Sequence, residues 1–271
     1  MTGRPPHDDP TDPAPAGYAA WVYGVMDGDV PDLERCPGVD PAHDARLVRH
    51  AGLAAVVSPV PRGDYEHPAL EQSLEDLERL ETLARGHERV LDEALRLGAV
   101  VPMRLCTIYD STERVREMLE QERAALADAL WRLHGTAEWG VKGYLVAPVT
   151  APAGQVADAP ASGTDYLARK RDARAAAQAA CQAAEKAVRV VHDRLGEHAV
   201  DAVLSRVQDR RLSGREHEMV LNAAYLVPEA RNAEFQSVFL SLCRRHAADG
   251  LLLELTGPWP AYHFAAAAAD G

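Results

Sequence analysis

The feature that most constrains the fold is a long alanine-rich segment at residues 165–195, whose apolar side chains recur at helical spacing. Steps of four and three residues alternate along it, which is the spacing of a coiled-coil-like seam. The seam is formed by Ala177, Cys181, Ala184, Val188, Val191 and Leu195. This pattern predicts one long helix with a narrow apolar face.

Strand-like segments flank this helix on both sides. Runs rich in β-branched and aromatic residues predict strands, and a second segment with helical spacing follows the third run. The predicted strands are 139–146, 199–207, 219–227 and 251–255, and the second helix is 229–248. The order β-α-β-β-α-β predicts a ferredoxin-like antiparallel sheet with both helices on one face.

The first half of the chain predicts a second α+β layer of less familiar order. A strand is expected at 18–25, and Ala51-Gly52 separates two apolar runs in the manner of a hairpin turn. A helix is expected at 68–97, with Gly86 as a break or bend, followed by a strand at 99–103. Asp110 to Glu113 has capping-box spacing and predicts one helix to about His134. Its expected core face carries Val115, Met118, Leu119, Leu126, Ala129, Leu130 and Leu133.

The predicted organisation is therefore α+β with two domains. Residues 1–16 contain five prolines and little to bury, and we expect a disordered tail there. Residues 17–136 form the expected N-terminal α+β domain, and residues 137–271 the expected C-terminal ferredoxin-like domain.

Composition narrows the classes of partner and compartment. The chain has 41 Asp and Glu against 29 Lys and Arg, a formal net charge of −12, which disfavours binding to nucleic acid or to an anionic membrane. The four cysteines have no CxxC spacing, and no segment has the apolar length of a signal peptide or membrane helix. We expect a cytoplasmic protein.

A search for catalytic motifs finds none of the common ones. GxSxG, GxxxxGK[ST], GxGxxG and HExxH are all missing from the sequence. The sequence therefore predicts no catalytic residue, no cofactor, no metal site and no enzyme activity.

Three residues and one basic cluster each allow a functional and a structural interpretation. His87 is a possible base or ligand but suits a hydrogen-bonded core histidine better. Arg104 closes a strand, and a buried ion pair is favoured over substrate binding. Trp259, between two prolines, is favoured as a core plug over a binding aromatic, and the basic cluster at 169–174 as a solvated face over an anion site.

Short strings in the chain resemble those of one family. Gly135, Glu138, Trp139, Gly140, Val141 and Lys142 match G-x-x-E-W-G-V-K, and residues 257–264 match G-P-W-P-x-Y-x-F. Together with His87 before Val90-Leu91 and the string Val101-Pro102-Met103-Arg104, they resemble the gas vesicle synthesis protein family GvpL/GvpF. The sequence departs from the family at Leu105-Cys106, where Phe-Gly is usual. The resemblance marks seven positions as structural or partner-binding: His87, Arg104, Glu138, Trp139, Lys142, Trp259 and Tyr262.

The resemblance also implies a function. Members are accessory or minor proteins of the gas vesicle and are thought to bind the hydrophobic shell protein GvpA, with other accessory proteins as further partners, and to assist nucleation or assembly. Such a protein would be found in the cytoplasm and at the gas vesicle. Two other hypotheses stay open, a small-molecule-sensing ferredoxin-like module and an unrecognised enzyme that uses His87, Arg104 and carboxylates of the 66–97 segment.

Overall fold

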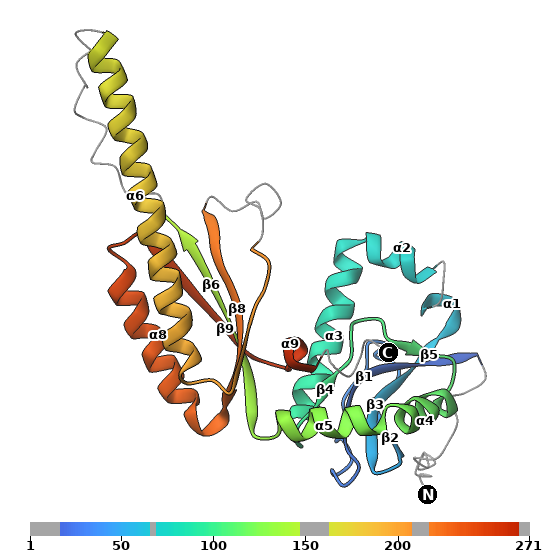
Figure 1. The fold of residues 1–271 in the computed structure, drawn as a ribbon. Helices are drawn as coiled ribbons and strands as arrows, with labels where there is room; N and C mark the ends of the chain where they lie inside the picture. Colours follow the sequence, from blue (N-terminus) through green and yellow to red (C-terminus); the bar gives the residue numbers. More distant parts are fainter. Residues whose placement is uncertain (1–16, 66–68, 147–162, 208–216, 266–271) are drawn as a thin grey trace, which may run out of the picture. The chain divides into compact units, whose positions relative to one another are not determined.

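The computed structural model describes residues 17–65, 69–146, 163–207 and 217–265 (Figure 1). The predicted tail at 1–16 lies outside them. The chain divides into two compact units, Met1–Thr136 with Pro260–Gly271, and Ala137–Trp259. The end of the chain therefore groups with the first unit and not with the ferredoxin-like sheet.

The sheet of the first unit is built around β1 (Tyr18–Asp27). Its strand order is β2-β3-β1-β4, and β5 also pairs with β1. The other strands are β2 (Arg46–His50), β3 (Leu53–Pro61), β4 (Val101–Pro102) and β5 (Ile108–Tyr109). The predicted hairpin is confirmed, because Ala51 and Gly52 join β2 to β3 with φ of 53° and 81°, the left-handed pair that a tight hairpin turn requires.

The predicted helix at 68–97 is wrong in its continuity. The structure has α1 (Arg62–Tyr65), α2 (Ala69–Glu75) and α3 (Leu77–Leu95). The break lies at Asp76, whose extended backbone and side chain cap α3 by accepting from the N–H groups of Glu78 and Arg79. Gly86 does not break the helix: it lies buried inside α3, where an added Cβ would stand 3.3 Å from Cα of Val39.

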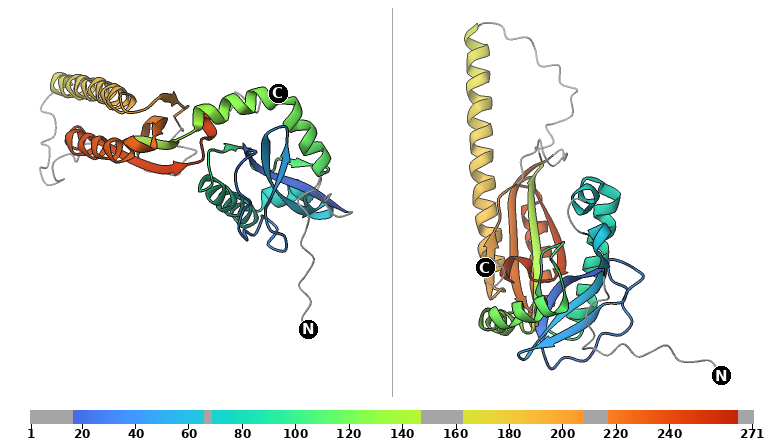
Figure 2. Two further views of the ribbon diagram at one scale, coloured as in Figure 1. Left: turned by 90° about the horizontal axis from the view of Figure 1, so that it is seen from below. Right: turned by 90° about the vertical axis from the view of Figure 1, so that its right-hand side faces the viewer.

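The single helix predicted after Asp110 is two helices in the structure. They are α4 (Thr112–Gln121) and α5 (Arg123–Leu133), divided at Glu122. Ser111, not Asp110, is the N-cap of α4, because its hydroxyl accepts from the N–H of Arg114. The division lets α4 pack on β2 and β3 while α5 packs on β1 and β4 (Figure 2). The predicted core face is confirmed, since all seven of its side chains are buried.

The second unit has the predicted order. It consists of β6 (Thr136–Leu145), α6 (Gly163–Gly196), β7 (Asp201–Leu204), β8 (Glu218–Pro228), the short 3-10 helix η1 (Glu229–Arg231), α8 (Asn232–His246) and β9 (Leu251–Trp259). The sheet order is β7-β8-β6-β9, with the first and third strands of the unit in the middle. Helices α6 and α8 lie together against one face of the sheet (Figure 1), as the ferredoxin-like pattern predicts.

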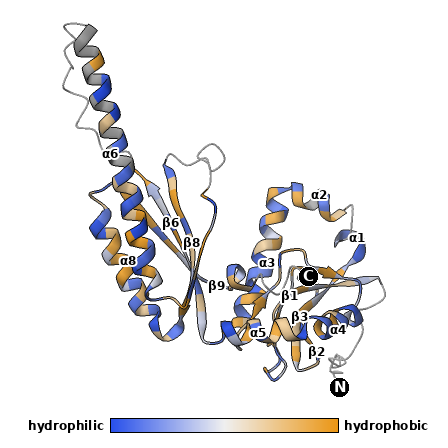
Figure 3. Ribbon diagram, in the orientation of Figure 1, coloured by the Kyte–Doolittle hydropathy of each residue, from blue (hydrophilic) through white to orange (hydrophobic). Residues whose placement is uncertain are grey.

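The core of the second unit lies between these helices and the sheet. Ala187, Val191 and Leu195 of α6 pack with Phe235 and Phe239 of α8. On both helices hydrophobic residues are interleaved with hydrophilic ones (Figure 3), as expected for helices with one buried face. None of the helices within the described residues has the length and apolar character needed to cross a bilayer.

Candidate functional site

His87 lies in the core of the first unit, with only 1% of its surface exposed. The indole N–H of Trp21 donates to Nδ1 at 3.0 Å, and Nε2 lies 3.2 Å from the carbonyl oxygen of Met103. Because Nδ1 accepts, the ring proton is on Nε2 and is donated to Met103. Burial lowers the pKa of His87 from 6.5 to about 4, so the ring is neutral at neutral pH. Both ring nitrogens of His87 already have hydrogen-bond partners. His87 is therefore not available as the base that the enzyme hypothesis needs.

A second buried polar network lies beside His87. The hydroxyl of Tyr23 is 2.7 Å from Oγ of Ser58 and accepts from the N–H of Val39 at 2.8 Å. Burial raises the pKa of Tyr23 to about 12. A Cβ at Gly38 would stand 2.4 Å from Oγ of Ser58, so glycine is required for this close approach. The network joins β1, β3 and the loop before β2, which is a structural role.

Arg104 is exposed, so the expectation that its side chain is buried is wrong. Its carbonyl oxygen accepts from the N–H and the hydroxyl of Thr107, at 3.1 and 2.7 Å, and these bonds form a tight turn. Cys106 in this turn has a φ of 68°, a left-handed conformation that suits glycine better. In this chain Cys106 therefore replaces the usual glycine of the family at a position whose backbone favours glycine.

Glu138, Trp139 and Lys142 follow one another on β6. Glu138 and Trp139 are buried, which confirms the burial expected for Trp139. The indole N–H of Trp139 donates to Oδ1 of Asn232 at 2.9 Å, and its ring lies 6.3 Å from that of Phe235. Lys142 is half-buried on the same strand, at the register position opposite Glu254 of β9.

The two long family strings pair with each other in the sheet. Glu138 on β6 stands opposite Trp259 on β9, in antiparallel register. A Cβ at Gly257 would lie 2.8 Å from the carbonyl oxygen of Glu138, and Gly257 has a φ of 117°, so only glycine fits. Trp259 itself is 46% exposed, and its expected role as a core plug is wrong.

Tyr262 begins α9 (Tyr262–Ala265) and packs against the core of the first unit. Its hydroxyl donates to Oε1 of Glu88 at 2.8 Å. The pKa of Glu88 is raised, because burial disfavours the charged carboxylate, and the hydrogen bond from Tyr262 offsets part of this effect. His87 thus joins α3 to Trp21 of β1 and to Met103, and Glu88 joins α3 to Tyr262. Sequence analysis missed Glu88, because a single carboxylate on an acidic helix has no local signature.

Removing the Tyr262 hydroxyl tests this attachment. Tyr262→Phe should lower the free energy of unfolding by about 1 kcal/mol, because a half-buried carboxylate loses a donor. It should also raise the pKa of Glu88 further. Urea unfolding at neutral pH measures the first effect. Tyr18→Phe is a matched control, and an equal loss in both variants would contradict a specific Tyr262–Glu88 bond.

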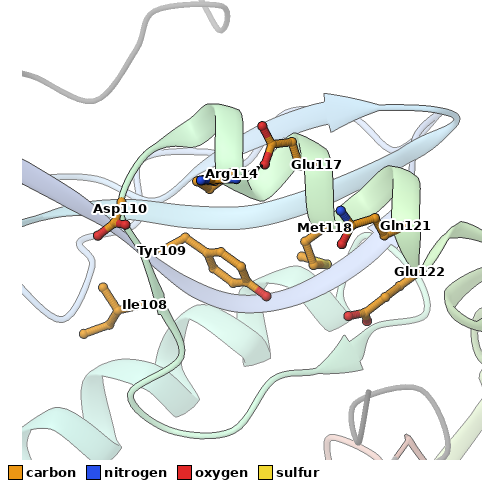
Figure 4. Close-up of a pocket in the computed structure, with 8 residues that line it drawn as sticks. All are labelled: Ile108, Tyr109, Asp110, Arg114, Glu117, Met118, Gln121 and Glu122. Atoms are coloured by element: carbon orange, nitrogen blue, oxygen red, sulfur yellow. Dashed lines mark hydrogen bonds and ion pairs between the residues drawn. The ribbon is translucent and has the colours of Figure 1, made fainter.

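A pocket of about 370 Å³ opens between β5 and α4 (Figure 4). Its lining includes Tyr109, Met118 and Glu122, and the guanidinium of Arg114, which pairs with Glu117 at 2.5 Å. Burial raises the pKa of Tyr109 and of Glu122. Glu117 therefore already neutralises the charge of Arg114. Within the described residues, no group of three or more His, Cys, Asp or Glu side chains could hold a metal ion. The pocket is a polar groove that sequence analysis did not predict.

The seven marked residues therefore gather in two places. His87, Arg104 and Tyr262 lie in the first unit, around α3 and the turn that follows β4, while Glu138, Trp139, Lys142 and Trp259 lie on β6 and β9. His87, Trp139 and Tyr262 make hydrogen bonds to other elements of their own unit, while Arg104 and Trp259 are exposed.

Comparison with known families matches residues 19–266 to the gas vesicle synthesis protein family GvpL/GvpF. The chain belongs to this family. The resemblance found in the short strings is thereby confirmed over nearly the whole chain, and the protein is a gas vesicle protein of the L/F type, involved in gas vesicle synthesis. The family is not known for enzyme activity.

Relatives agree in sequence and in fold. Gas vesicle protein L of Streptomyces sp. (strain CB03234) is 38% identical over 259 residues, covering 92% of this chain and 94% of the relative. Gas vesicle protein F2 of Halobacterium salinarum is 26% identical over 247 residues, covering 90% of each chain. The crystal structure of GvpF from Anabaena sp. PCC7120 superposes with a TM-score of 0.66 at 18% identity, over 92% of this chain and 96% of that one. This likeness confirms the α+β fold with two antiparallel sheets.

Proposed function

We propose that the protein binds the hydrophobic shell protein GvpA in the cytoplasm and at the gas vesicle, and assists nucleation or assembly of the vesicle wall. Membership of the GvpL/GvpF family over residues 19–266 carries this proposal. The hydrogen bonds of His87, Trp139 and Tyr262 support it, since a binding protein needs a rigid scaffold and no reactive centre. Other accessory proteins of the vesicle are the further partners.

The physical task suits an acidic partner. A shell subunit with an apolar gas-facing surface aggregates when that surface meets water. A partner with a formal net charge of −12 keeps the complex dispersed while it covers the apolar surface. No cofactor takes part in such a task.

We place the contact on the first unit. Residues 27–44 and the segment that follows residue 59 mix apolar, proline and acidic residues, and the structure gives part of each a core role. Cys36 and Val39 of the first segment and Tyr65 of the second are buried in the core. The exposed remainder is smaller, around residues 29–35.

The sensing hypothesis gains no support from the pocket. The groove of Figure 4 lies at β5 and α4 in the first unit. A small-molecule module of the ferredoxin-like type would instead need a cavity at an edge of the second sheet, along β7 or along β9. The shell-binding proposal is therefore the one we develop.

Salt dependence tests the proposed mode of binding. Purified full-length protein is titrated against the shell protein fused to a carrier, at about 0.1 M and about 1 M NaCl. The dissociation constant should change by less than about threefold, because salt screens exposed charges and not buried apolar area. The carrier alone is the control.

Two outcomes would contradict the proposal. Loss of binding at moderate salt would contradict an apolar contact. Absence of binding to the shell protein and to every other gas vesicle component would contradict the function itself.

A further inference from the structure

Trp131 on α5 is the most exposed large hydrophobic side chain among the described residues, at 81%. The chain has four tryptophans, and two of them, Trp21 and Trp139, are buried. A tryptophan left in water on a rigid helix keeps a large apolar surface available to a partner. Helix α5 is otherwise an ordinary amphipathic element, whose opposite side supplies Leu126, Leu130 and the rest of its core face.

The surroundings of Trp131 extend this apolar surface. Ala124 and Ala127 are exposed and precede Trp131 by seven and four residues, so the three side chains lie on one stripe of the helix. Arg123 and Arg132 are exposed at its two sides. We call these five residues, Arg123, Ala124, Ala127, Trp131 and Arg132, the α5 face.

The two arginines of the α5 face differ from their neighbours in one respect. Among the described residues, neither Arg123 nor Arg132 lies within ion-pair distance of a carboxylate, although Asp128 stands one helical turn before Arg132. Five other exposed arginines of the first unit are paired with carboxylates: Arg35 with Asp44, Arg49 with Asp32, Arg85 with Glu81, Arg96 with Glu93, and Arg114 with Glu117. Two more have other partners, since Arg79 lies over the ring of Tyr65 and Arg89 donates to the carbonyl oxygens of Pro37 and Gly38. In a chain of net charge −12, unpaired cations on both sides of an exposed tryptophan form a distinct local surface.

We propose that the α5 face is the docking surface for the shell protein, through an apolar surface of that protein that carries carboxylates at its edge. The inference rests on the proposed function and assigns it a location in the first unit. Tryptophan and arginine are the residues that most often dominate binding energy at interfaces. The unpaired guanidiniums select a partner with carboxylates by charge complementarity.

A second copy of this chain fits the α5 face less well. Symmetric self-docking would place the same patch on both sides of the two-fold axis. Arg123 and Arg132 of each copy would then meet the arginines of the other copy. Like charges across such an interface oppose association.

Substitutions in the full-length chain test the proposal. Trp131→Ala should weaken binding to the carrier-fused shell protein about tenfold or more. Arg123→Glu with Arg132→Glu should weaken it by a smaller factor of about two to three, because exposed charges at the edge of an apolar contact contribute little. Leu77→Ala removes a side chain of α3 that is 79% exposed, and Arg85→Glu reverses a charge away from the face. Both control variants should bind like the wild type.

The outcomes separate the two proposals. A wild-type chain that does not bind the shell protein would overturn the proposed function. A wild-type chain that binds, with Trp131→Ala as tight as Leu77→Ala, would overturn only the α5 face. Because Trp131 is exposed, its variant should keep the wild-type circular dichroism and melting temperature, which excludes misfolding as the cause of weaker binding.

Fluorescence quenching gives an independent reading. Trp259→Phe leaves Trp131 as the exposed indole, since Trp21 and Trp139 are buried. Addition of the shell protein should reduce acrylamide quenching of this variant, and unchanged quenching in the bound state would overturn the proposal. A wild-type dimer that becomes monomeric in Trp131→Ala, measured by light scattering, would assign the face to a second copy and overturn it as well.

Discussion

Trp139→Ala is expected to lower the free energy of unfolding by roughly 3–5 kcal/mol, because it empties a large buried site between β6 and α8. Trp139 is 6% exposed, packs on Phe235 and donates its indole N–H to Asn232. Alanine removes the ring and leaves the amide oxygen of Asn232 without this donor. Urea unfolding, followed by circular dichroism, measures the change.

The matched control for this substitution is Trp131→Ala. It makes the same chemical change at a site that is 81% exposed, so the free energy of unfolding should change by no more than about 0.5 kcal/mol. If Trp139→Ala left unfolding unchanged but abolished shell-protein binding, Trp139 would be a binding residue and its structural role would be refuted.

Acidification is expected to remove about 3 kcal/mol of stability through His87 alone. The pKa of His87 falls from 6.5 to about 4 in the folded chain because burial disfavours the imidazolium. Between these two values the unfolded chain binds the proton and the folded chain does not, so stability falls as the pH falls from about 6.5 to about 4. Above about pH 6.5 this contribution is fully present.

Unfolding free energies measured between about pH 7 and pH 4 test the assignment. His87→Asn should be less stable at neutral pH, but its stability should fall less steeply with acid than that of the wild type. His134→Asn, at an exposed histidine, should keep the wild-type slope. Equal slopes in wild type and His87→Asn would show that His87 does not carry the acid sensitivity.

Local sequence patterns were sufficient for most of the elements. The seam at 177–195 predicted α6, and α5 buries the face that its spacing predicted. The hairpin at Ala51-Gly52 follows from the left-handed backbone that its turn needs. These features depend on neighbours a few residues apart, so the chain itself carries the information. The family strings carried the functional class in the same local way.

Other features depend on residues far apart in the chain and were decided by tertiary packing. Arg104 and Trp259 were expected inside and lie exposed, because burial depends on which distant elements cover a strand end. The 68–97 pattern is helical throughout, yet the chain breaks at Asp76 where α3 turns onto the core. The hydrogen bond from Tyr262 to Glu88 joins residues 174 positions apart. No local periodicity records such a contact, since it forms only when Tyr262 packs against the first unit and its hydroxyl meets the partly buried carboxylate of Glu88.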